Sequence, residues 1–287
     1  MTGALLLAGY AATAGWLAPR ALSRAWLARA PRLAIALWLA LATSWVAAAA
    51  LAVLAATGSV PLSWAGSGPG MGPLAGRGGL AGTAAEAAGL LLAALLASRA
   101  AGCVAAGQAR GWRERRQHAA FLAAASSPDS ELGAAVLDDD APAAYCLPGR
   151  RPQVVLSAGA LAALGPGQLQ AVMAHERAHL RGRHHLVVAW AFALGRAFPF
   201  VPLLARAGGQ IAVLAEMAAD DTAARRHDPA ELAAAIARVQ RLLTPGPQPG
   251  QRARAVRLAG GAAALILSAA VALLPLIVVA CDVAPRT

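Results

Sequence analysis

The sequence predicts a mainly α-helical membrane protein, with about four transmembrane helices and one polar domain before the last of them. Three observations lead to this fold class. Hydrophobic residues make up 58% of the 287 residues and charged residues only 14%, whereas a soluble domain carries about 25% charged residues. Several apolar runs reach the ~20 residues that a spanning helix needs. Between the last two runs lies a stretch of roughly 150 residues, which is long enough to bury a core of its own.

The expected spans follow one another along the chain. They are Met1 to Ala18, Leu33 to Ala56, Ala84 to Gly107 and Leu258 to Cys281. The first is uncharged and lacks the basic start of a signal peptide, so we interpret it as a span. The third contains Glu86 and Arg99 but is still apolar enough to cross. These limits divide the chain into a membrane region (1–107), a polar domain (108–257) and a last span with a short tail (258–287).

The distribution of arginine predicts the orientation in the membrane. Four arginines and no acidic residue lie between the first two spans, and four more arginines follow the third span. In the loop 57–83, Arg77 is the one charged residue. Because cytoplasmic loops are rich in basic residues, we expect a multi-pass protein of the cell membrane with its N-terminus outside and its polar domain in the cytoplasm. The lipid bilayer then accounts for the basic residues, and no direct nucleic-acid partner is expected. The three cysteines have no spacing typical of disulfides or zinc sites and are expected to be small buried residues: Cys103, Cys146 and Cys281.

Local patterns predict the elements of the polar domain. They are a helix (113–125), a loop (126–140), two strands (Ala144 to Leu147 and Gln153 to Ser157), a helix (167–180), an apolar stretch (186–204), two further helices (211–226 and 229–243) and a linker (244–250). Pro148-Gly149 is a turn signal between the two strands. Gly165-Pro166-Gly167 is a break before the helix that follows. The apolar stretch is either core of this domain, which we favour, or a kinked helix in the membrane.

Residues 175–179 read His-Glu-Arg-Ala-His, which is the pattern H-E-x-x-H. Residues four apart on a helix lie on one face, so His175 and His179 can offer two imidazoles to one metal ion. Zinc favours such nitrogen ligands in a tetrahedral site. Glu176 follows the first ligand directly, where it can take a proton from a zinc-bound water as this water attacks a carbonyl. The pattern predicts one Zn²⁺ per chain and is typical of a zinc peptidase.

The third protein ligand has two candidates. His185 completes the spacing H-E-x-x-H-x-x-G-x-x-H, with Gly182 where a sharp turn is needed. Glu216 would instead complete a His-His-Glu site of the thermolysin type. Asp220, one turn further on, would accept the N–H of a ligand imidazole. Spacing alone leaves both candidates open, and exposed or capping roles are expected for the other histidines, His118, His184 and His227.

Several features together resemble the BlaR/MecR-type family of membrane zinc peptidases. These are the order of the spans, H-E-R-A-H in a cytoplasm-facing segment, F-P-F-V-P at 198–202 and E-M-A-A-D-D at 216–221. The chain is also similar to the neighbouring HtpX/Ste24-type membrane peptidases, which share the motif and the E-x-x-x-D helix. The resemblance implies a gluzincin-like peptidase domain in which Glu216 is the third zinc ligand and Asp220 supports a ligand imidazole. His185 is then a chance match.

The resemblance also implies a substrate and a place to bind it. The strand before the metal helix would pair through an open edge with an extended peptide; its residues are Gln153, Val154, Val155, Leu156 and Ser157. The implied substrate is a cytoplasmic transcriptional repressor of the BlaI type. HtpX-like quality control of membrane proteins and a non-enzymatic scaffold are alternatives, and a homo-oligomer stays open. The β-lactam sensors carry a large extracellular domain after the last span, whereas Asp282 to Thr287 follow it here, so we expect no such sensing.

Overall fold

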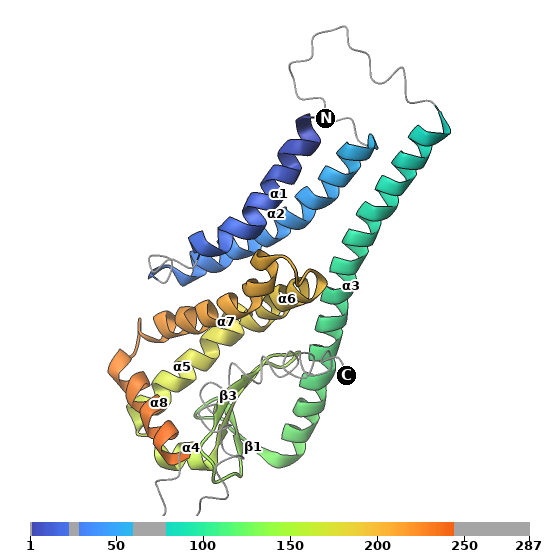
Figure 1. Ribbon diagram of the computed structural model, residues 1–287. Helices are drawn as coiled ribbons and strands as arrows, with labels where there is room; N and C mark the ends of the chain where they lie inside the picture. The colour runs from blue at the N-terminus through green and yellow to red at the C-terminus, as the bar shows by residue number, and fades with distance from the viewer. Residues whose placement is uncertain (1, 23–28, 60–78, 244–287) are drawn as a thin grey trace, which may run out of the picture. The chain divides into compact units, whose positions relative to one another are not determined.

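The computed structural model describes residues 2–22, 29–59 and 79–243 (Figure 1). The helices are α1 (Thr2–Leu22), α2 (Pro31–Thr57), α3 (Leu80–Ala125), α4 (Ala158–Ala163), α5 (Pro166–Gly182), α6 (His184–Ala197), α7 (Pro202–Ala223) and α8 (Pro229–Leu243). The strands are β1 (Ser126–Asp129), β2 (Ala134–Leu137), β3 (Ala144–Leu147) and β4 (Gln153–Ser157). The predicted last span, Leu258 to Cys281, and the linker before it lie outside the described residues.

The described residues form two compact units. The first contains the residues up to Ala106 together with Trp190–Ile211, and the second contains Gly107–Ala189 and the described residues from 212 onward. The apolar stretch 186–204, which we expected in the core of the polar domain, therefore packs for the most part in the first unit. The stretch is divided into α6 and α7 at residues 198–201, because Pro199 and Pro202 cannot continue a helix.

In the first unit, α1 and α2 lie side by side (Figure 1). The Tyr10 and Ser44 hydroxyls are 2.6 Å apart, and Trp45 Nε1 donates a 2.9 Å hydrogen bond to the Ala11 carbonyl. The tilted rings of Trp45 and Phe198 have centroids 5.5 Å apart. These two side-chain contacts join α1 to α2.

Two of the described helices, α2 and α3, are long and apolar enough to cross a membrane. Only 11% of the most apolar window of each is buried, which distinguishes them from the enclosed core helix of a soluble domain. Leu90, Leu91 and Leu95 of α3 are among the exposed apolar side chains. These two helices indicate association with a membrane. A helix is present where we predicted the first span, but α1 is not among the described helices that meet the criterion of length and hydropathy.

The 46 residues of α3 form one continuous helix, where we predicted a span and a separate helix from Arg113. The connecting residues 108–112 contain no proline. Their one glycine, Gly111, costs about 1 kcal/mol inside a helix, which is too little to end it. The helix therefore runs on from the first unit into the second.

The second unit contains a four-stranded sheet of order β1-β2-β4-β3. β1 and β2 form an antiparallel hairpin inside the segment 126–140 that we predicted as a loop, so that prediction was wrong for most of its length. The hairpin turn is held by Asp129 Oδ1, which accepts hydrogen bonds from the N–H groups of Glu131 and Leu132. Gly133 ends the turn at φ 61°, a conformation that glycine adopts without steric cost. Of the predicted loop, the hairpin turn 130–133 and the acidic run 138–140 remain connections.

The strands β3 and β4 confirm the two strands predicted around Pro148-Gly149, and they pair antiparallel. β4 also pairs in parallel with β2, so this strand is interior to the sheet. The expectation of an open edge on Gln153–Ser157 is therefore wrong. β3 is the strand that pairs on one side only at this end of the sheet.

The helix α5 packs against β3, β4 and α8. Side chains from these elements share one buried cluster, which includes Val154, Leu156, Val172, Met173, Leu232, Ala235 and Val239. Arg177 Nη2 donates a 2.6 Å hydrogen bond to the Leu132 carbonyl and so joins α5 to the hairpin turn. The core of the second unit thereby fixes the position of the helix that carries H-E-x-x-H.

Candidate metal centre

Local interactions define both ends of α5, which confirms the helix predicted over 167–180. Pro166 occupies the first turn, where the missing N–H costs no hydrogen bond. Gln168 Oε1 accepts a 3.1 Å hydrogen bond from the Gly165 N–H. The helix ends at Gly182, and Arg183 directly after it has a left-handed φ of 48°, as is common at helix ends.

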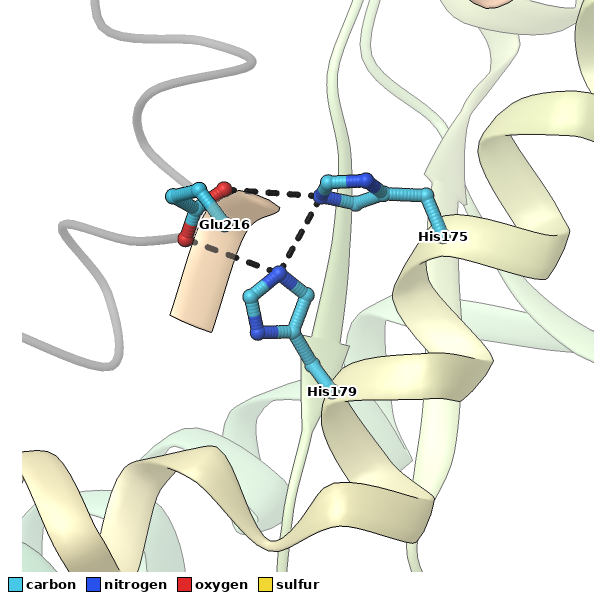
Figure 2. Close-up of side chains that lie close together, drawn as sticks. All are labelled: His175, His179 and Glu216. Carbon is cyan, nitrogen blue, oxygen red and sulfur yellow. Dashed lines mark hydrogen bonds and ion pairs between the residues drawn. The ribbon is translucent and has the colours of Figure 1, made fainter. Parts of the chain in front are cut away.

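His175 and His179 of α5 converge with Glu216 of α7 (Figure 2). Nε2 of His175 lies 3.1 Å from Nε2 of His179 and 3.4 Å from Oε2 of Glu216. Oε1 of Glu216 lies 3.5 Å from Nε2 of His179. The two histidines are buried, at 7% and 8% exposure.

The donor atoms fit a zinc ion. Ligands that bind tetrahedral zinc at about 2.0–2.1 Å are separated from one another by about 3.3 Å. The two imidazole nitrogens are 3.1 Å apart, and each has one Glu216 oxygen near it, at 3.4 Å (Oε2 to His175) and 3.5 Å (Oε1 to His179), distances close to this value. Two imidazoles and a carboxylate are also a ligand set of catalytic zinc sites. Across residues 2–22, 29–59 and 79–243, this is the one group of His, Cys, Asp and Glu close enough to hold a metal ion.

His185, the other candidate for the third ligand, is not in this group. It lies at the start of α6, where burial and the positive charges of Arg115 and Arg183 lower its pKa to about 4. Of the two candidates that spacing left open, the geometry therefore favours Glu216. The role of Glu216 as a zinc ligand stays a prediction.

Asp220 lies one turn after Glu216 on α7, with Oδ1 2.9 Å from Nδ1 of His175. Burial by itself lowers the pKa of His175, but Asp220, Glu216 and the charge of Glu176 outweigh burial and raise this pKa to about 10. Burial likewise opposes ionisation of Glu216, whereas hydrogen bonds from His175 and His179 lower its pKa to about 2. Without a metal, His175 is therefore a cation among carboxylates.

Glu176 has no exposed surface, and the thiol of Cys146 on β3 lies against it. Burial first, then the charge and the hydrogen bond of Glu176, raise the pKa of the Cys146 thiol. The thiol therefore stays protonated beside the Glu176 carboxylate. Cys146 is buried, as we predicted, but its contact with Glu176 depends on the packing of β3 against α5.

Two histidines that we expected in exposed or capping roles make specific side-chain contacts instead. Nδ1 of His184 lies 3.0 Å from Nδ1 of His179. Nε2 of His118 lies 2.8 Å from the Tyr145 hydroxyl. The sequence signal that could have singled out His184 is its place directly after the turn that ends α5.

The comparison with protein families matches residues 108–273 to a family model described as Peptidase family M48. The match covers more than half of the 287 residues and includes all three candidate ligands and Glu176. No curated protein and no solved structure shows a significant match to the chain. The family match and the donor geometry point to the same metal chemistry.

Proposed function

The chain belongs to peptidase family M48, whose members are zinc metallopeptidases, and from this premise we propose that it is an integral membrane zinc metalloendopeptidase. Its proposed substrate is a protein, whose peptide bonds are hydrolysed at the cytoplasmic face of the cell membrane. The observation that carries the proposal is the convergence of His175, His179 and Glu216, whose ligand atoms lie within 4.8 Å of one another, because two imidazoles and a carboxylate are a ligand set of catalytic zinc sites.

Each side chain near the centre has a defined part in hydrolysis. His175, His179 and Glu216 would hold the zinc ion, which when bound supplies a Lewis acid for the reacting groups. Glu176 accepts the proton of the attacking water and returns it to the leaving amine. Asp220 holds the His175 ring with Nε2 toward the other donors. Glu176 and both histidines are buried, which keeps bulk water from the reaction.

We place the peptide substrate along β3 rather than β4. An extended peptide adds to a sheet through a strand edge, and β4 has neighbours on both sides. β3 carries Cys146, which contacts Glu176. A peptide paired with β3 would therefore pass close to the general base.

The proposed location rests on the two apolar helices and on the distribution of arginine. Only 11% of the most apolar window of α2 and of α3 is buried, which fits contact with lipid. The arginines of 20–32 and 110–116 fit the cytoplasmic side. We therefore propose a multi-pass protein with the N-terminus outside and the peptidase domain in the cytoplasm.

For the substrate, we propose a cytoplasmic repressor of the BlaI type, on the resemblance to BlaR/MecR-type peptidases. An HtpX-like quality-control enzyme would instead cleave many membrane proteins. The experiment compares protein N-termini by mass spectrometry in cells that express the wild-type chain or Glu176→Gln. A new N-terminus within one DNA-binding repressor supports the proposal, and a broad set from membrane proteins supports quality control. Identical sets of N-termini from a wild-type chain that holds zinc would indicate a non-enzymatic scaffold.

A further inference from the structure

His184 contacts His179 at the ring nitrogen that does not face the other donor atoms. The two Nδ1 atoms are 3.0 Å apart, and the rings meet edge to face with centroids 4.9 Å apart. Nε2 of His179 lies 3.1 Å from His175 and 3.5 Å from Glu216. Both ring nitrogens of His179 are therefore engaged, one toward the metal position and one toward His184.

The turn between α5 and α6 brings His184 to this position. Arg183 is left-handed, with φ 48° and ψ 37°, so α5 ends there and α6 begins with the next residue. Gly182 leaves room for the imidazole, because a Cβ at this position would overlap Nε2 and Cδ2 of His184. The glycine that completes the spacing toward His185 thus makes room for His184.

We propose that His184 is a positioning residue for the zinc ligand His179, an inference that rests on the proposed zinc site. A histidine that binds zinc through Nε2 carries its proton on Nδ1. Nδ1–H of His179 then donates to Nδ1 of His184, and the proton of His184 lies on its own Nε2. This hydrogen bond fixes the tautomer and the ring orientation of His179, as Asp220 does for His175. The two ligands of α5 thus have different partners, a carboxylate and a neutral imidazole.

Replacements of His184 separate this role from simple packing. An asparagine Oδ1 can take the place of histidine Nδ1, whereas a glutamine Oε1 reaches the place of Nε2 and leucine has no acceptor. Zinc affinity is measured on the full-length protein in detergent, by competition with a chromogenic chelator. We expect His184→Leu and His184→Gln to bind zinc about 10- to 100-fold more weakly, and His184→Asn to stay within about threefold of the wild type.

A second variant tests the same contact through the backbone. Gly182→Ala should displace the His184 ring and weaken zinc binding to a similar degree. In a His184→Ala background the ring is gone, so the added Cβ at 182 should weaken binding no further. His227→Leu is the matched control, because His227 is a half-buried histidine outside the donor group.

The outcomes separate this inference from the proposed function. Equal zinc affinity of the Leu, Gln and Asn variants, whether unchanged or uniformly weak, would overturn the positioning role. If His184→Leu does not fold, the comparison of Asn with Gln decides. A folded wild-type protein that binds no zinc would overturn the proposed function, and this inference with it. A wild type that binds zinc as tightly as every His184 variant would overturn this inference alone.

Discussion

In the metal centre, the histidines and the carboxylates stabilise one another's charged forms when no metal ion lies between them. Despite burial, hydrogen bonds from the two histidines hold the pKa of Glu216 near 2, and Asp220 and Glu216 raise the pKa of His175 to about 10. A zinc ion needs the lone pair of His175 and must therefore displace its proton. Zinc binding and proton release are thus coupled at every pH between the ordinary histidine pKa and about 10.

We predict that zinc displaces about one proton from His175 at pH 8, and that the apparent zinc affinity rises about tenfold per pH unit toward pH 10. A histidine with a pKa of about 6.5 would already be deprotonated and would release almost none. Calorimetric titration of the metal-free protein in buffers of different ionisation enthalpy measures the release.

The comparison variant for this prediction is Asp220→Asn, which removes the negative charge beside His175 Nδ1. The pKa of His175 falls in this variant, so zinc binding releases a smaller fraction of a proton at pH 8. Asp221→Asn, at the exposed neighbouring position, should behave as the wild type. An affinity that does not change between pH 7 and 9 would contradict the prediction.

Glu176→Gln removes the general base while it keeps the shape of the side chain. We predict that kcat falls about 10²- to 10⁴-fold, the usual contribution of a general base. Zinc stoichiometry should not change, because Glu176 is not in the donor group. Cleavage kinetics and zinc content are measured on the same preparation, with Glu131→Gln at an exposed position as the control. Loss of zinc from Glu176→Gln would contradict these roles.

At the scale of elements, prediction succeeded where the signals are local. The helix α5 begins at a Gly-Pro-Gly break, and β3 and β4 flank a Pro-Gly turn. β1, with the sequence Ser-Ser-Pro-Asp, shows no apolar alternation and becomes a strand through its pairing with β2. The continuity of α3 was missed because the polar residues after Gly107 look like a boundary, although nothing in them ends a helix.

The residues of the candidate site were also predictable only where the signal is local in the sequence. His175, Glu176 and His179 follow from one short motif, and Glu216 needed a resemblance because it lies about 40 residues further on, on another helix. The contacts of Cys146 and His184 depend on tertiary packing and on one left-handed residue. The interior place of β4 depends on its pairing with two distant strands, which a local pattern does not encode.

Ser157 lies where β4 meets α4, and its side chain stabilises this junction. Its Oγ accepts hydrogen bonds from the N–H groups of Ala160, at 3.0 Å, and of Ala143, at 2.8 Å. Ser157→Ala leaves both donors without this acceptor, so we predict a loss of about 2 kcal/mol in unfolding free energy. Chemical denaturation of the zinc-free protein measures the loss, with Ser130→Ala at an exposed turn position as the control. Equal stability of the two variants would show that Ser157 does not support the fold.

At the scale of the whole molecule, α3 is longer than a membrane crossing requires. Its 46 residues span about 69 Å at 1.5 Å per residue, whereas the hydrocarbon core is about 30 Å thick. The apolar first half is therefore sufficient to cross, and the half with Arg110, Arg113, Arg115 and Arg116 extends beyond it. Because the helix is continuous, we expect its basic half and the hairpin that follows it to lie on the same side of the membrane.

This side is the cytoplasm if the arginines act as they do in other membrane proteins. We predict that Glu131→Cys, at an exposed position of the hairpin, reacts with a membrane-impermeant maleimide only after cells are permeabilised. Gly79→Cys, before α3, should react in intact cells; it is exposed, and a Cβ there meets open space. Both are made in a chain whose Cys103, Cys146 and Cys281 are alanine. The reverse labelling pattern would place the peptidase domain outside the cell, where a cytoplasmic repressor is not available, and would leave the zinc chemistry of α5 and α7 to act on an extracellular protein.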